Sequence, residues 1–424
     1  MPEYLPRVVD GELDELMPGL PAIALEGPRG VGKTATAQRR ATTSFLLDDP
    51  AQRELIAADP TRLGAAAPPV LVDEWQLLPG VWDTIRRAVD TDPTPGRYLL
   101  TGSASPLHAP THTGAGRIVT LRMRPLTLAE RQVETSTVSI TTLLSGNAGP
   151  VVGHTGLRLH DYAAEVVRSG FPGLRALPGR ARRAALDGYL GRVVDRDFPD
   201  QGRPVRRPAT LRAWLTAYAA ATATTTSLDR IRDAATPGQD DKPAKTTTIA
   251  YRDVLTRLWL LDPLPGWLPT RSHLTRLTAA PKHHLTDPGL AARLLGASPE
   301  SLLAGTPPAT PIPRDGTFLG SLFESLLTLN VRVFGQAAEA SVHHLRTRDG
   351  EHEVDLIVQR ADGKILALEV KLAATVSDRD VRHLRWLADL LGDGLLDAAV
   401  LTTGADAYRR RDGVAVIPAA LLGP

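Results

Sequence analysis

Gly27-Pro28-Arg29-Gly30-Val31-Gly32-Lys33-Thr34 fits the P-loop pattern G-x-x-x-x-G-K-(S/T) at every fixed position. The apolar residues 22–25 precede it and predict a buried parallel strand. Residues 34–41 follow it and, because they contain neither glycine nor proline, predict a helix. Strand, glycine-rich loop and helix therefore occur in the order that a phosphate-binding loop requires, and we expect the chain to bind a nucleoside triphosphate.

The residue types in this loop suit a phosphate ligand. Its three glycines permit backbone conformations that a Cβ would forbid, so successive amide groups can turn toward the β-phosphate. Lys33 supplies a mobile positive charge for the β and γ oxygens, and the Thr34 hydroxyl is placed to complete the coordination of Mg²⁺. A helix that begins near Lys33 adds the positive end of its dipole. The residues expected to bind the nucleotide are Gly27, Pro28, Arg29, Gly30, Val31, Gly32, Lys33 and Thr34.

A second apolar run, residues 70–72, ends in two adjacent carboxylates and has the form of a Walker B strand. We expect Asp73, at the carboxyl end of the strand, to hold Mg²⁺ together with Thr34. Glu74 is expected to orient and polarise the water that attacks the γ-phosphate. The alternative is that the two carboxylates merely cap a strand, but the neighbouring P-loop favours hydrolysis.

Two further segments carry candidate residues for sensing and for charge stabilisation. Residues 97–103 pass from an apolar strand into small polar residues, where Thr101 or Ser103 is placed to report on the γ-phosphate. Residues 116–119 begin another strand, and Arg117 is a candidate arginine finger, acting in cis or from a neighbouring subunit. The chain contains 43 arginines and six lysines, so solvation of the surface is an equally good explanation for Arg117.

Length and composition limit the class of protein. With 424 residues the chain is too long for a single core, so two or three domains are expected. The net charge of +2 requires neither a nucleic-acid nor a membrane partner, and the absence of cysteine excludes disulfides and thiolate zinc sites. There is no secretory leader and no run of about 18 apolar residues. We therefore expect a soluble, cytoplasmic protein with no membrane partner.

The hydrophobic pattern changes along the chain and predicts three domains. Residues 1–130 alternate strands and helices, which is typical of an α/β P-loop NTPase domain with a parallel sheet. Residues 131–305 show helical periodicity and predict a helical middle domain, whose pieces are compatible with a winged helix. The segment 306–315, rich in proline and threonine, predicts a linker. Residues 316–424 then form a C-terminal α/β domain.

The middle domain carries two features that have ordinary explanations. His283 and His284 lie beside Lys282, but no spaced partner ligand follows, so a metal site is not expected there. Asp287 and Pro288 instead predict the start of a helix, because aspartate is a good N-cap and proline suits the first helical position. A locally basic set of arginines is read as a solvated face in preference to a phosphate track. This set is Arg180, Arg182, Arg183, Arg203, Arg206 and Arg207.

The C-terminal domain is predicted to contain a helix over residues 320–334 followed by three strands within residues 341–372. The turn signals Asp349-Gly350 and Asp362-Gly363 separate these strands. The third strand carries Glu-Val-Lys at residues 369–371. Two residues that are two positions apart on a strand project from the same face.

Four charged residues of this domain form a candidate nuclease site. Glu369 and Lys371 share a face of the third strand, Asp355 lies in the preceding strand and Glu324 lies on the helix. This order matches the acidic, acidic, Glu-x-Lys arrangement of restriction-endonuclease-like nucleases, in which carboxylates hold Mg²⁺ and the lysine steadies the attacking water or the phosphate. Two alternatives remain: an exposed strand with ordinary polar residues, or a nuclease-like fold without cleavage.

Further short motifs are spread along the chain. They are Tyr4-Leu5-Pro6-Arg7, Val72-Asp73-Glu74-Trp75-Gln76, Leu100-Thr101-Gly102-Ser103-Ala104, Gly114-Ala115-Gly116-Arg117, Arg124-Pro125-Leu126-Thr127 with Glu130, Ser169-Gly170-Phe171-Pro172, Pro281-Lys282 with Asp287 and Gly289-Leu290, and Glu353-Val354-Asp355 with Leu368-Glu369-Val370-Lys371. Together with the P-loop they resemble prokaryotic AAA-type ATPases that carry a C-terminal restriction-endonuclease-like domain of unknown function. The resemblance covers nearly the whole chain. Trp75 departs from it, since the family more often has an aliphatic residue there.

The resemblance implies ATP binding and hydrolysis, a helical or winged-helix middle region and a nuclease-like C-terminal domain. The leading hypothesis is an Mg²⁺-dependent ATPase whose nucleotide state moves the middle domain relative to a C-terminal domain directed at DNA or RNA. The alternative is a slowly hydrolysing switch whose C-terminal domain binds protein or nucleic acid without cleaving it. A small-molecule kinase is a third hypothesis. An arginine finger supplied in trans would require a homo-oligomer or another protein partner.

Overall fold

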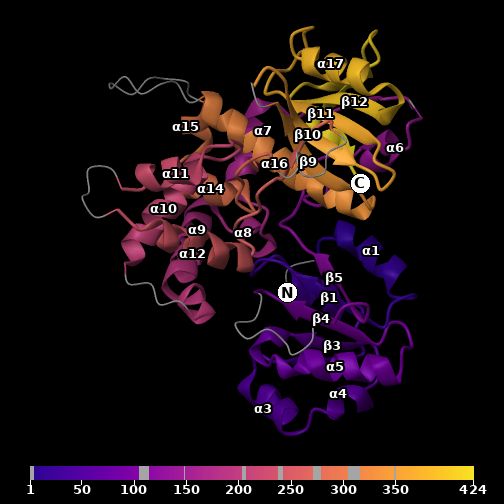
Figure 1. Cartoon of the computed structure of the whole chain (residues 1–424), viewed down its shortest axis with the longest axis vertical. Coiled ribbons are helices and arrows are strands. Elements are labelled where there is room, and N and C mark those ends of the chain that lie inside the picture. The colour runs from indigo at the N-terminus through magenta and orange to yellow at the C-terminus, as the bar shows by residue number, and fades with distance from the viewer. Residues whose placement is uncertain are drawn as a thin grey trace.

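The computed structural model describes residues 4–104, 114–147, 149–202, 207–236, 242–270, 278–303, 316–347 and 350–424. Its three main parts are the N-terminal region (residues 4–130), the middle region (residues 155–303) and the C-terminal region (residues 316–424). In Figure 1 they lie at the bottom, at the left and at the upper right. The predicted linker at 306–315, together with Arg203, Arg206 and Asp349, lies outside the described residues.

The N-terminal region contains a five-stranded parallel sheet, which confirms the prediction of a parallel sheet of the P-loop type. The strand order is β2-β3-β4-β1-β5, with β1 at the junction between β4 and β5. Its strands are β1 (Ala22–Glu26), β2 (Thr43–Leu46), β3 (Val70–Asp73), β4 (Tyr98–Gly102) and β5 (Ile118–Arg122). The central strands are buried along their length because helices cover both faces.

The helices of this region are short and follow the strands closely. They are α1 (Val8–Leu16), α2 (Lys33–Gln38), α3 (Pro50–Ala58), α4 (Arg62–Ala65) and α5 (Gly80–Thr91). The helix predicted for residues 34–41 is thus present as α2 but ends earlier, because the chain turns there to enter β2. Trp75 is buried against Trp82 of α5, with ring centroids 4.6 Å apart, so this bulky residue packs on one face of the sheet.

The middle region is helical, as predicted. Its elements are α7 (Leu159–Arg168), α8 (Pro172–Arg175), α9 (Gly179–Arg192), the π-helical turn η2 (Val193–Asp197), η3 (Pro199–Gln201), α10 (Pro208–Ala220), α11 (Leu228–Ala234), α12 (Lys245–Arg257), α14 (Pro288–Leu294) and α15 (Pro299–Leu303). Asp287 caps α14 by accepting a hydrogen bond from the Gly289 N–H at 2.7 Å, which confirms the predicted helix start.

A short hairpin follows α12 in the middle region. Antiparallel bridges join Leu261 to Leu285 and Leu264 to Lys282. We call residues 260–285 the hairpin, with the part at 271–277 outside the described residues. Three helices, α10 to α12, followed by a hairpin have the connectivity of a winged helix, and that assignment stays a prediction.

The C-terminal region confirms the predicted helix and the three predicted strands. The helix α16 (Gly316–Ala337) is longer than predicted, and the strands β9 (Ser341–Arg346), β10 (Glu353–Gln359) and β11 (Ile365–Val370) pair antiparallel. The remaining elements are α17 (Arg382–Leu391), η4 (Gly392–Gly394), β12 (Leu395–Thr402), β13 (Asp406–Arg409), β14 (Ala415–Pro418), η5 (Ala419–Leu421) and β15 (Leu422–Gly423). Helices α16 and α17 contact the sheet, and α16 also contacts α1, α7 and α14.

Segments assigned from the sequence to the middle domain complete the C-terminal sheet. Its eight strands have the order β7-β13-β14-β12-β11-β10-β9-β8, in which β7 (Gly153–His154) and β8 (Gly266–Trp267) come from residues 131–305. In addition, β6 (Val138–Ser139) pairs with β15, and α6 (Ile140–Leu144) contacts α16 and β12. Strands of two residues have too little pattern to be found by periodicity.

One buried carboxylate connects all three regions. Asp262, in the hairpin, lies 2.8 Å from Arg124 Nε, 2.9 Å from Arg332 Nη1 and 3.2 Å from Arg122 Nη1. Arg122 ends β5, Arg124 follows it, and Arg332 lies on α16. Burial alone would raise the pKa of Asp262, but the three guanidinium groups outweigh burial and hold this pKa far below its usual range. We call these four residues the Asp262 cluster.

None of the helices in the described part of the chain combines the length and apolarity that a bilayer span requires.

Candidate functional site: a P-loop and a carboxylate cluster

The P-loop joins β1 to α2, as the sequence predicts. Gly30 and Gly32 have φ values of 84° and 102°, a left-handed region that side chains rarely adopt. At Gly27 a Cβ would lie 2.1 Å from the Met123 carbonyl oxygen, so the third glycine is required by close packing. All three positions therefore require glycine, Gly30 and Gly32 for their backbone conformation and Gly27 for close packing.

Lys33 is buried at the start of α2. Its ammonium donates to the carbonyl oxygens of Gly27 at 2.9 Å and Pro28 at 3.0 Å, so it lies across the loop. Burial lowers the pKa of Lys33 from 10.5 to about 8, and the nearby carboxylates of Glu74 and Asp73 only partly oppose this effect. The ammonium is thus a positive charge that lacks a fully compensating anion, which a phosphate would supply.

We predict that MgATP binds about tenfold more weakly at pH 9 than at pH 7, because free Lys33 loses its proton above pH 8 and only the charged form attracts phosphate. The lowered pKa places this loss between pH 7 and 9, whereas an ordinary lysine would lose its proton near pH 10.5. Isothermal titration calorimetry at each pH measures the effect. The Lys33→Met variant, which has no charge to lose, is expected to bind weakly with no such trend, and equal wild-type affinities at both pH values would contradict the prediction.

The end of β3 places Asp73 beside the P-loop threonine. Thr34 Oγ1 donates to Asp73 Oδ1 at 2.7 Å, and Thr101 at the end of β4 also donates to this oxygen. Burial raises the pKa of Asp73, with the two threonine hydrogen bonds acting against it. A hydroxyl and a buried carboxylate are hard oxygen donors, so Thr34 and Asp73 fit Mg²⁺, whose remaining ligands in such sites are phosphate oxygens and water.

Glu74 adopts a left-handed backbone conformation, with φ 53°, which is uncommon for a residue with a side chain and is typical of functional sites. Its carboxylate accepts a hydrogen bond from Ser103 Oγ at 2.7 Å and another from the Gln76 amide. The two predicted sensor residues therefore each bind one of the two adjacent carboxylates. Thr101 binds Asp73, and Ser103 binds Glu74.

A cavity of about 370 Å³ opens beside Glu74, between the N-terminal and middle regions. Glu74, Ser103 and Arg29 contribute from the N-terminal region, and the opposite wall includes Tyr189 and Asp197. Arg29 Nη1, on the P-loop, lies 3.2 Å from Asp197 Oδ1 on the π-helical turn η2. The P-loop and the η2 turn of the middle region are thus in direct contact next to Glu74.

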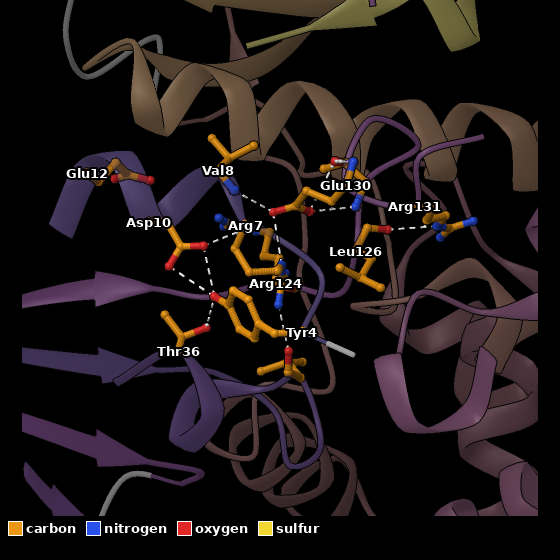
Figure 2. A network of polar contacts seen from close by, with 12 residues as sticks. Tyr4, Arg7, Val8, Asp10, Glu12, Thr36, Arg124, Leu126, Glu130 and Arg131 are labelled. Carbon is orange, nitrogen blue, oxygen red and sulfur yellow. Dashed lines mark hydrogen bonds and ion pairs between the residues drawn. The ribbon is translucent and has the colours of Figure 1, made fainter. Parts of the chain in front are cut away.

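The N-terminal segment hydrogen-bonds to the P-loop and to Glu130 through Arg7, whose contacts are drawn in Figure 2. Arg7 donates to the Val31 carbonyl oxygen at 2.7 Å, to the Arg124 carbonyl oxygen at 2.7 Å and to Glu130 Oε1 at 3.0 Å. The Tyr4 hydroxyl contacts Asp10 and lies 2.9 Å from Thr36 Oγ1 on α2. Two of the short motifs, Tyr4-Leu5-Pro6-Arg7 and the segment with Glu130, therefore meet at the P-loop.

The structure places Arg117 away from the nucleotide loop. The P-loop follows Glu26, which pairs in register with Arg122. Arg117 precedes β5 at the opposite, amino-terminal end of the strands, about 16 Å away along the strand. Its side chain lies 2.8 Å from Asp90. The prediction that Arg117 acts as an arginine finger within its own chain is therefore wrong, because open parallel sheets bind their ligands at the carboxyl ends of the strands. Donation from another subunit stays a prediction.

The C-terminal candidate residues meet, but around a cation that the sequence did not predict. The ammonium of Lys282, on the hairpin of the middle region, lies 2.7 Å from Glu324 Oε1, 3.0 Å from Glu353 Oε1 and 3.1 Å from Asp355 Oδ1. The Lys282 side chain is only 1% exposed. Burial acts to lower its pKa, but Asp355, Glu324 and Glu353 together raise it above the usual value.

Glu369 and Lys371 contact each other on the same face, as predicted. Lys371 Nζ lies 3.0 Å from Glu369 Oε2, and the buried Glu369 carboxyl group also hydrogen-bonds to Asp355. Burial, and then the neighbouring charge of Asp355, raise the pKa of Glu369 well above its usual value. Burial and Asp355 likewise raise the pKa of Glu324 to about 8.

The predicted Mg²⁺ site of the C-terminal region is therefore not formed in this conformation. In the described part of the chain, no group of three or more His, Cys, Asp or Glu side chains is arranged to hold a metal ion. The physical reason is that Lys282 already supplies the positive charge between Glu324 and Asp355. The signals in the sequence were the rarity of lysine, since Lys282 is one of six, and the short motif Pro281-Lys282.

His283 and His284 contact different partners. His283 Nε2 lies 2.7 Å from the Thr226 carbonyl oxygen, and His284 Nδ1 lies 3.1 Å from Ser325 Oγ. Burial lowers the pKa of both histidines. They are neutral core residues that fix the hairpin carrying Lys282.

Three segments of the chain match known protein families. Residues 20–132 match a family described as an AAA domain, residues 159–301 match a domain of unknown function (DUF8612), and residues 319–422 match a domain of unknown function (DUF4143). Two uncharacterised proteins, of Mycobacterium bovis and Mycobacterium tuberculosis, are each 25% identical over 408 residues, which is 94% of this chain and 80% of each relative. The P-loop, Asp73 and Glu74 lie within the first match, which supports an AAA-type P-loop ATPase relationship for the N-terminal region.

Proposed function

We propose that the protein is an Mg²⁺-dependent ATP hydrolase whose nucleotide state acts on its middle region. The observation that carries this proposal is the meeting of Thr34, Asp73 and Glu74 at the carboxyl edge of one parallel sheet, directly beside the P-loop. Open parallel sheets bind their ligands at this edge.

The residues divide the chemistry between them. The amides of the loop and the Lys33 ammonium bind the phosphate oxygens, and Thr34 and Asp73 would hold Mg²⁺, which neutralises phosphate charge when bound. Glu74 accepts a proton from, and orients, the water that attacks the γ-phosphate. Ser103 and Gln76 fix the position of the Glu74 carboxylate until that water arrives.

The path to the middle region begins at the P-loop itself. Arg29 contacts Asp197 across the cavity, and its side chain is 54% exposed. A triphosphate in the loop offers Arg29 a competing anion, so nucleotide binding weakens the contact with η2. Release of γ-phosphate reverses this competition, and the middle region thereby senses the state of the nucleotide.

For the C-terminal region we propose a nuclease-like fold directed at DNA or RNA, built around Glu324, Asp355, Glu369 and Lys371. The position of Lys282 favours the second hypothesis, a switch that binds its partner without cleaving it, because an ammonium between the carboxylates excludes the metal ion that cleavage needs. No observation favours the small-molecule kinase.

The direct test is phosphate release from MgATP by the full chain, with and without single-stranded and double-stranded nucleic acid. Lys33→Ala removes about two charge-assisted hydrogen bonds to phosphate, so MgATP should bind about 3 kcal/mol, or about a hundredfold, more weakly. Binding without release would establish the switch, and a phosphorylated metabolite would establish the kinase. Wild-type affinity in Lys33→Ala would reject the nucleotide site.

A further inference from the structure

A cavity of about 230 Å³ lies between α7, α9, α14 and α15 of the middle region, which are labelled in Figure 1. Its apolar lining comes from Ala164, Val167 and Leu186. A cavity needs only about 10–15 Å³ to hold one water molecule, so this one is large enough for a phosphate group and several attached atoms. Because its described lining residues all come from the middle region, it is separate from the proposed nucleotide site.

The polar lining of this cavity is mostly basic. Four arginines contribute to it: Arg168 on α7, Arg182 and Arg183 on α9, and Arg293 on α14. Arg293 is paired with Asp187, but Arg182 uses one of its five N–H groups, which donates to the Leu177 carbonyl oxygen at 3.1 Å. Arg183 is exposed and forms no ion pair with another described residue. Most donors of Arg182 and Arg183 are therefore available to a ligand.

The carboxylate of Glu165, on α7, does not neutralise this charge. It is shared by three guanidinium groups, since it lies 2.9 Å from Arg175, 3.1 Å from Arg131 and 3.4 Å from Arg168. Burial, and then the positive charges of the neighbouring arginines, lower the pKa of Arg182. The arginines beside the cavity thus repel one another, and a bound anion would relieve this repulsion.

We propose that this cavity binds a phosphate group, with Arg182 and Arg183 as its main donors. The planar fork of a guanidinium matches the spacing of phosphate oxygens, and a dianion can satisfy two such groups at once. In addition, Gly179 begins α9 and lines the cavity, and Pro178 gives this helix no side-chain cap, so the positive end of its dipole adds to the attraction. The proposal does not depend on ATP binding.

The test measures binding of radiolabelled inorganic phosphate by equilibrium dialysis in about 0.15 M salt, which screens isolated surface charges. All variants are full-length chains that carry Lys33→Ala and are studied without nucleotide or Mg²⁺, so that the P-loop contributes little. We expect one phosphate per chain with a Kd of about 1 mM, as about two charge-assisted hydrogen bonds would give. Arg182→Gln and Arg183→Gln should each weaken binding about 10–100-fold.

Arg180→Gln is the matched control, because Arg180 is exposed on the same helix, lies outside the described lining of the cavity and should leave binding unchanged. Circular dichroism checks the fold of each variant, and Arg183→Gln keeps the test decisive if the loss of the Arg182 contact with Leu177 unfolds the chain. Equal weakening by Arg180→Gln and Arg183→Gln would overturn the proposal, since general surface charge would then explain binding. Equal affinity for acetate, or no binding at ten times the expected Kd, would also overturn it.

A competition experiment distinguishes the two sources of a phosphate group. A short oligothymidylate is added to the chain with labelled phosphate already bound. Displacement of the label, lost together with phosphate binding in Arg183→Gln, supports the proposal with a nucleic-acid backbone as the source. Retention of the label supports it with a free phosphate ester as the source.

Discussion

Replacing Asp262 by alanine is expected to lower the free energy of unfolding by about 3–5 kcal/mol. The change leaves Arg122, Arg124 and Arg332 close together and buried without their shared anion. Burial already lowers the pKa of Arg122 to about 10 and that of Arg332, which shows how little solvent these cations reach. Because the cluster joins three regions, its loss should also separate them. Denaturant unfolding followed by circular dichroism measures the loss.

Asp262→Asn is the matched control, because it keeps the size of the side chain and removes only the charge. The native pKa of Asp262 is depressed, so its charge contributes stability above pH 4, where an unfolded aspartate is ionised, and loses this contribution as the pH falls. The difference in the free energy of unfolding between wild type and Asp262→Asn should therefore decrease by about 1.4 kcal/mol for each pH unit below 4. A difference that does not change with pH would show that packing, and not charge, explains the loss.

The sequence predicted those parts of the fold in which the local backbone geometry permits few residue types. The glycines of the P-loop, the strand ending in Asp73 and the N-cap Asp287 each leave a signal within a few residues, because the backbone geometry there permits few residue types. The face shared by Glu369 and Lys371 follows from the two-residue period of a strand. Local rules were therefore sufficient for the loop and strands that carry the proposed nucleotide site.

Contacts between distant segments were beyond these rules. Lys282 meets Glu324 and Asp355 across 42 and 73 positions of sequence, and a lysine beside two histidines carries no mark of such partners. Arg117 failed as a finger within the chain for a related reason: its distance from the P-loop depends on strand direction, and the residue type does not reveal it. In both cases the arrangement of distant elements, and not the residue type, decided the outcome.

Replacing Glu74 by glutamine is expected to reduce phosphate release from MgATP by about 10²–10³-fold, since glutamine cannot accept the proton of the attacking water. Affinity for MgATP should change by less than about threefold, because glutamine has the same length and its carbonyl oxygen can still accept from Ser103. Single-turnover hydrolysis and calorimetry measure the two quantities separately. Glu54→Gln, an exposed residue of α3, is the matched control and should hydrolyse at the wild-type rate.

A Glu74→Gln variant that still hydrolyses ATP would show that another residue of the same cavity accepts the proton. Asp197 and Asp200 also line it, but Asp197 is already paired with Arg29, and both belong to the middle region. A carboxylate there would take part in hydrolysis only while the two regions stay in contact. If Asp200→Asn loses activity and Glu74→Gln retains it, hydrolysis depends on the position of the middle region. If instead Glu74→Gln loses activity and Asp200→Asn retains it, the residues that hydrolyse ATP all lie in the N-terminal region. The middle region then responds to the nucleotide without taking part in its hydrolysis.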